Sequence, residues 1–218
     1  MFKTLRDFLR SRKYWVLALY FVVYILAFFI IEEHTPTEGY WVTDTFIDSY
    51  IPFVPGFAVF YILWYPLFAA VGIPTLIKDG EAFKRWMYYN MFTLTATLVL
   101  DVLVPNGQHL RPQDVQVTDL GTWIMSIIWA ADTPTNVFPS MHVLGCLGDI
   151  LCAFDSRIFT RPWRAVITAA CVLCMASTVL VKQHAFIDTV GALIFAVPAF
   201  FLFYRGRFLR RKNAAVPS

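Results

Sequence analysis

Two residues near the end of the chain have the types and the spacing of an oriented nucleophile. His184 and Asp188 are four positions apart, so on a helix they would share one face. A carboxylate in that place accepts the imidazole N–H, fixes the tautomer of the ring and raises its basicity. We expect His184 to act as a nucleophile or as a base.

A second group of polar residues lies at the start of an apolar run. Ser140 and His142 follow Pro139 in the first turn of an expected helix, where free backbone N–H groups and the positive end of the helix dipole favour an anion. Arg111 carries a planar guanidinium, which suits bidentate recognition of phosphate. These residues predict an anion site beside the oriented histidine.

Together the two groups supply what phosphoryl transfer through a phosphohistidine requires. The reaction needs an oriented nucleophile, donors for the phosphate oxygens and a second histidine to protonate the leaving oxygen. It requires no metal, and we expect no cofactor.

The elements that position these residues are expected to be membrane helices. Of 218 residues, 58% are hydrophobic and only 15% are charged, against about 45–50% and 25% in soluble domains. A soluble globular protein is excluded, and four cysteines are too few for a disulfide scaffold. We predict an all-α integral membrane protein, a bundle of six transmembrane helices forming a single domain over residues 1–218. The spans are about 14–31, 51–77, 86–104, 139–154, 165–181 and 183–204. Prolines in the second span predict a kinked or partly broken helix.

The distribution of basic residues predicts the orientation of this bundle. With the N-terminus inside, 16 of the 18 Lys and Arg residues fall on the cytoplasmic side, including a basic leader that begins at Lys3 and a basic tail over 205–212. Arg111 and Lys182 are the two exceptions, and all four histidines fall on or near the same outer side. We expect both termini to be cytoplasmic and the active site to lie at the outer leaflet of the cell membrane.

The longest outer segment, residues 105–138, contains a candidate amphipathic helix. Its apolar residues recur at helical spacing: Leu120, Trp123, Ile124, Ile127, Ile128 and Ala131. Such a helix could lie along the outer bilayer surface or be a buried structural helix, and the sequence favours neither.

The polar clusters resemble the signature blocks of the type 2 phosphatidic acid phosphatase superfamily, which are Lys-x6-Arg-Pro, Pro-Ser-x-His and Ser-Arg-x5-His-x3-Asp. The matching residues, in the required order, are Arg111-Pro112, Pro139-Ser140-Met141-His142, and Ser177, His184 and Asp188. The motifs cover residues 101–191. The resemblance implies that His184 attacks phosphorus, that Asp188 orients it and that His142 acts as acid and then as base. It also implies that Arg111 and Ser140 hold phosphate oxygens.

Two departures from these blocks remove cations from the expected phosphate pocket. The family's Lys is Val104 here, and its Arg before the nucleophilic histidine is Thr178. Lys182, two residues before His184, is a candidate replacement. The reduced pattern looks like the branch that contains inositol phosphorylceramide synthase, in which a hydroxyl group takes the place of water. We therefore expect a lipid phosphate as substrate, and keep both a phosphatase and a lipid phosphotransferase as readings.

Other polar residues carry weaker expectations. His34 and His109 are read as hydrogen-bonded interfacial residues, and Asp101 and Asp149 as either functional or structural. Cys171 and Cys174 have the spacing of a metal or redox pair but are read as packing residues. The basic tail is expected to contact anionic membrane lipids and not to bind nucleic acid.

Two further classes of protein remain open from the sequence. In a haem protein, His142 and His184 would be axial ligands, which would have to face each other within the bilayer core. A transporter is disfavoured by the absence of inverted repeats, although the kinked second span is compatible with one. The sequence does not determine the oligomeric state.

Overall fold

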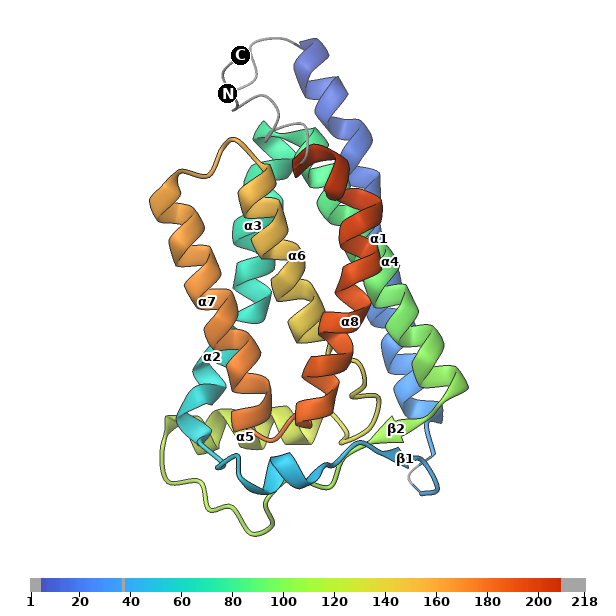
Figure 1. Cartoon of the computed structure of the whole chain (residues 1–218), viewed down its shortest axis with the longest axis vertical. Helices are drawn as coiled ribbons and strands as arrows, with labels where there is room; N and C mark the ends of the chain where they lie inside the picture. The colour runs from blue at the N-terminus through green and yellow to red at the C-terminus, as the bar shows by residue number, and fades with distance from the viewer. Residues whose placement is uncertain (1–4, 37, 209–218) are drawn as a thin grey trace.

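The chain folds into a bundle of helices with a small cap at one end (Figure 1). The structure, a computed structural model, describes residues 5–36 and 38–208. Lys3 and the part of the basic tail after residue 208 lie outside these residues. The helices and strands are α1 (Leu5–His34), β1 (Trp41–Val42), η1 (Phe46–Ser49), η2 (Pro55–Phe57), α2 (Ala58–Ile62), α3 (Trp64–Lys78), α4 (Gly80–Leu103), β2 (Asn106–Gly107), α5 (Leu120–Ala131), α6 (Met141–Asp155), α7 (Arg161–Leu180) and α8 (Phe186–Phe203).

Four segments are long and apolar enough to cross a membrane: Tyr14–His34, Pro55–Lys78, Arg161–Leu180 and Phe186–Phe203. The sequence prediction of six spans is therefore confirmed for four. The helix α6 has only 15 residues, which gives it a length of about 22 Å. The longer helix α4 carries polar residues among its buried positions, such as Asn90, Thr93 and Asp101.

The exposed surface of α1 indicates an apolar surrounding. Between Tyr14 and His34, nine of its large apolar side chains are exposed: Trp15, Val16, Leu19, Val22, Val23, Ile25, Leu26, Phe29 and Ile30. A contiguous apolar surface of this kind is rare on soluble monomers. Together with the four long apolar helices, it supports a membrane protein.

The second predicted span is broken, as its prolines predict. The helical segments η2, α2 and α3 follow one another, and α2 is separated from α3 at Leu63. Pro66 lies in the first turn of α3, where a proline without an N–H is tolerated. The break turns the short helix α2 toward α5 and α7, which it contacts.

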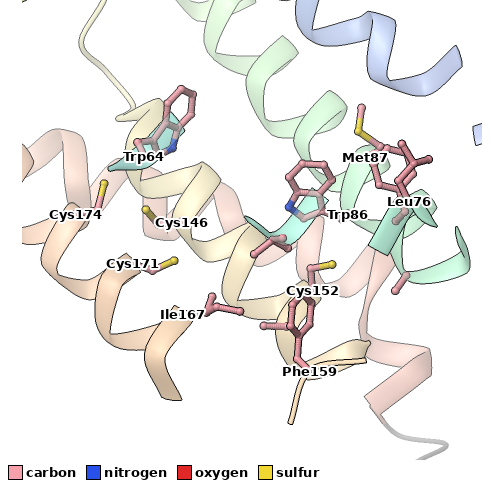
Figure 2. Packing of buried hydrophobic residues seen from close by; sticks show 14 of the residues in the cluster. Trp64, Leu76, Trp86, Met87, Cys146, Cys152, Phe159, Ile167, Cys171 and Cys174 are labelled. Carbon is pink, nitrogen blue, oxygen red and sulfur yellow. The ribbon is translucent and has the colours of Figure 1, made fainter. Parts of the chain in front are cut away.

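The helix α6 occupies the centre of the bundle and packs against α3, α4, α7 and α8. Its close approach to α3 depends on Gly145, since a Cβ atom there would lie 2.5 Å from Cε2 of Phe68 and 2.6 Å from Nε1 of Trp64. Figure 2 shows the neighbouring core, in which Cys146 of α6 lies near Cys171 and Cys174 of α7. These cysteines are buried and free among apolar residues, in keeping with their interpretation as packing residues.

A cap made of loops, the parallel pair β1–β2 and α5 closes the lower end of the bundle in Figure 1. The predicted helix over residues 120–131 is confirmed as α5, which begins at the N-cap Asp119. Its apolar stripe divides between two environments: Ile124 is buried, whereas Leu120, Trp123 and Ile127 are exposed.

The opposite end of the bundle carries buried ion pairs. Asp155, at the end of α6, accepts hydrogen bonds from Nε of Arg85 at 2.7 Å and from Nε of Arg207 at 3.1 Å. The helix α1 begins and α8 ends at this end, away from the cap (Figure 1).

Candidate active site

The candidate site lies at the cap end, where α6 and α8 begin and α7 ends (Figure 1). The backbone N–H of Ser140, the N-cap of α6, donates to the carbonyl of Asp188 in the first turn of α8, over 3.1 Å. This contact brings together the first turns of two helices that are distant in sequence. Ser140, His142, His184 and Asp188 therefore meet, as the motifs predict.

His184 is held by two acceptors. Its Nδ1 atom lies 2.9 Å from the carbonyl oxygen of Val137 and 3.4 Å from Oδ2 of Asp188. Since a carbonyl only accepts, Nδ1 carries the proton and the lone pair is left on Nε2. Asp188 is thus the more distant partner, and its Oδ2 also accepts from the backbone N–H of Ala185 at 2.8 Å.

His142 lies next to His184, with 5.7 Å between the ring centroids. The rings of Tyr61 and Trp64 pack against it at 4.3 and 4.8 Å. Both nitrogens of His142 are buried, and neither has a hydrogen-bond partner within residues 5–36 and 38–208. Because buried polar groups are normally paired, two such nitrogens beside an oriented histidine indicate a place for a ligand.

The carbonyl that orients His184 is itself fixed by Asn106, a residue that the sequence analysis did not identify. Oδ1 of Asn106 accepts from the backbone N–H groups of Val137 and Phe138 at 2.9 and 2.8 Å. Its Nδ2 donates to Oδ1 of Asp101 at 3.2 Å and to the carbonyl of Val104 at 3.1 Å. Asp101 therefore has a structural partner.

Arg111 is directed into the loop that follows α5. Its NH1 and NH2 groups donate to the carbonyls of Asp132 and Thr133, each at 2.8 Å. Its Nε is buried and has no partner among the described residues. A chain of contacts links Arg111 to Gln183, the residue before His184: NH2 lies 3.8 Å from Oδ2 of Asp132, which accepts from Nε2 of Gln183 at 3.0 Å. The phosphate role of Arg111 stays a prediction.

The sequence analysis gave no role to Asp132, which belongs to no motif, or to Gln183, which directly precedes His184. Burial, and after it the negative charge of Glu32, raise the pKa of Asp132 to about 6. Glu32 also accepts from the backbone N–H and the hydroxyl of Thr133, at 2.8 and 2.7 Å. An acidic group thus lies beside Arg111, and its charge depends on pH near neutrality.

Lys182 has a different place from the one expected of a phosphate ligand. Its Nζ donates to the carbonyls of Asp48 and Ile51, at 2.9 and 2.6 Å. Its backbone adopts a left-handed conformation with φ +56°, which reverses the chain between α7 and α8. We therefore assign Lys182 to holding this turn against η1. The backbone N–H of Phe186 reinforces the same junction by donating to Oδ1 of Asp48 at 2.7 Å.

The remaining predicted residues have ordinary partners. The Ser140 hydroxyl oxygen accepts from the backbone N–H of Val143 at 3.5 Å, as an N-cap does, and its phosphate role stays a prediction. His109 lies 3.0 Å from the hydroxyl of Tyr40, and His34 bonds the carbonyl of Ile30. Asp149 accepts from the indole N–H of Trp86 at 2.8 Å.

Comparisons of the chain with protein-family models, curated proteins and solved structures find no match. The fold and the site define the protein as a class: a helical protein with several helices apt to cross a membrane and two buried, adjacent histidines at one end of its bundle. Within the described residues, no group of three or more histidine, cysteine or acidic side chains could hold a metal ion.

Proposed function

We propose that the protein is an integral membrane enzyme that cleaves lipid phosphate esters through a phosphohistidine intermediate. In this proposal α4 and α6 cross the membrane with the four long apolar segments. Both termini are cytoplasmic, and the site lies at the outer face of the cell membrane. The basic residues near the bundle end opposite the site, including Arg85 and Arg207, support this orientation.

One observation carries the proposal. His184 donates its Nδ1 proton to Val137 and has Asp188 beside it, while its ring lies 5.7 Å from the unpartnered ring of His142. A nucleophile must present a free lone pair in a fixed direction, and this tautomer leaves that lone pair on Nε2.

The geometry supports a two-step reaction. Nε2 of His184 attacks phosphorus and forms the N–P bond, the ester P–O bond breaks, and His142 gives a proton to the leaving oxygen. In the second step His142 takes a proton from water, which attacks phosphorus, and the N–P bond breaks to release phosphate. The free Nε of Arg111 is the donor that we assign to the phosphate oxygens.

A second candidate is a lipid phosphotransferase, in which the hydroxyl of an acceptor takes the place of water. Thr178, which stands where the family has an arginine, is fully buried, and its carbonyl accepts from the backbone N–H groups of Gln183 and His184. No cation stands at that position. A phosphodiester, with less charge than a monoester, needs fewer cations, and this favours a diester donor.

A panel of lipid phosphomonoesters and phosphodiesters, with and without an alcohol acceptor, tests both candidates. We expect wild-type protein to release inorganic phosphate or to form a new diester lipid. An acid-labile phosphoenzyme should be detectable during turnover. His184→Ala should abolish turnover and phosphoenzyme. His109→Ala, which changes a histidine bound to Tyr40 outside the site, is the matched control. Turnover that persists in His184→Ala would exclude the mechanism.

A further inference from the structure

A large apolar groove runs between α1 and α3, and α4 forms its floor. Its volume is about 610 Å³, within the range of about 300–1,000 Å³ that is usual for ligand sites. The lining is almost entirely aliphatic and aromatic, and includes Phe21 and Phe28 of α1, Ala69 and Leu76 of α3, and Phe83 and Trp86 of α4.

The groove ends at the candidate active site. Trp64 lines the groove, and its ring also packs against His142 at 4.8 Å. Met141, the residue before His142, lines the groove as well. A molecule in the groove is therefore separated from the catalytic histidine pair by a single aromatic side chain.

A second cavity continues from the same end. It has a volume of about 540 Å³, and its charged lining residues are Arg111 and three carboxylates, Glu32, Glu33 and Asp132. Phe29 lines both this cavity and the apolar groove. An almost wholly apolar groove and a cavity with charged side chains in its wall thus share one lining residue, Phe29. This is the division of chemistry within an amphiphile, whose tail and head have opposite polarity.

We propose that the groove between α1 and α3 binds the hydrocarbon tail of the lipid substrate, with the phosphate of the same molecule at His184 and Arg111. This inference rests on the proposed function and deepens it, because it names the substrate class: a phosphate ester with a long hydrocarbon tail. From Trp64 to Leu76 the α3 wall covers thirteen residues, a rise of about 18 Å. One leaflet of a bilayer core measures about 15 Å, so the groove matches a tail of full leaflet length.

A photoreactive hexadecyl phosphate, with a diazirine in its tail, tests the placement in purified full-length protein. Crosslinks mapped by mass spectrometry should fall on peptides of α1, α3 and α4 that line the groove. Excess unlabelled hexadecyl phosphate should remove them, whereas 1-hexadecanol should compete poorly. Crosslinks elsewhere would overturn the proposal. Equal competition by hexadecanol would also overturn it, because the groove would then hold any membrane lipid.

Two neighbouring alanines of α3 supply a matched pair of variants. Both are exposed, but Ala69 lines the groove and Ala70 does not. Ala69→Phe should fill part of the groove and reduce groove labelling about tenfold, the effect of overpacking a formed cavity. Ala70→Phe, with the same added volume, should label like wild type. Full labelling of a folded Ala69→Phe protein would refute the tail site.

The same probe separates failure of this inference from failure of the proposed function. Labelling of the groove should persist in His184→Ala, since tail binding does not use the nucleophile. If the groove is labelled but wild-type protein turns over no phosphate ester, the proposed enzymatic function is refuted and the proposed lipid-binding groove is retained. Turnover that depends on His184, with crosslinks outside the groove, would refute the tail site alone.

Discussion

Asn106 should be the most sensitive residue of the loop that orients His184. Replacement by leucine keeps the size of the side chain and removes its four hydrogen bonds. The backbone N–H groups of Val137 and Phe138 would then lose their acceptor. Each buried donor left without a partner costs about 1–3 kcal/mol, so the free energy of unfolding should fall by about 2–6 kcal/mol.

Thermal unfolding of the detergent-solubilised protein measures this loss. For a chain of this length 1 kcal/mol corresponds to about 2–4 °C, so Asn106→Leu should melt at least about 4 °C below wild type. The control is Asn136→Gly: Asn136 also lies in this loop, but among the described residues its side chain accepts only the hydroxyl of Thr35. Its left-handed backbone, φ +56°, suits glycine. If both variants melted together, Asn106 would not be the anchor of the Val137 carbonyl.

Three further predictions concern other parts of the cap. The rise in the pKa of Asp132 from 3.8 to about 6 means that its charge destabilises the fold above pH 6 and not below pH 4. The free energy of unfolding should fall as pH rises through this window, and Asp132→Asn should remove the fall. The full pKa shift corresponds to about 3 kcal/mol. Because a third of the side chain is exposed to solvent, we expect a loss of about 1 kcal/mol. Identical pH–melting curves for both proteins would contradict this. Gly121→Ala should lower the free energy of unfolding by about 1–3 kcal/mol, since its Cβ would lie 2.4 Å from the carbonyl oxygen of Pro55. Gly56→Ala is the control, because a Cβ there meets nothing within 4 Å. Equal melting temperatures of the two variants would refute the close contact. Lys182→Met should lower the free energy of unfolding by about 1–3 kcal/mol because two carbonyls lose their donor. Unchanged stability together with weaker binding of inorganic phosphate would contradict this structural role and indicate that Lys182 is a phosphate ligand.

The sequence predicted those parts of the fold that depend on local patterns. Hydrophobic runs located the helices, prolines predicted that the second span is broken without fixing the position of the break, and helical spacing located α5. Two predicted spans, α4 and α6, do not meet the length and composition of a membrane helix. The reason is that a helix covered by its neighbours, as α6 is, needs neither a full apolar surface nor full length.

The site was predictable only where its residues share a motif. His142, His184 and Asp188 meet because their motifs begin adjacent helices. The contacts of Arg111 and Lys182 with backbone carbonyls were not predictable, because spacing along one helix carries no information on distant loops. The carbonyl of Val137 could not be found either, since any residue type supplies a carbonyl.

The shortness of α6 has a consequence for access to the site. The helix measures about 22 Å, whereas the hydrocarbon core of a bilayer measures about 30 Å. Asp155 is joined to Arg85 and Arg207 at the far end of α6, which fixes that end near the opposite interface. In a bilayer crossed as proposed, His142 would then lie several ångströms below the headgroup level. Hydrolysis would require the phosphate group to descend into the protein while its tail lies in the groove between α1 and α3, so local membrane thickness would tune the reaction rate.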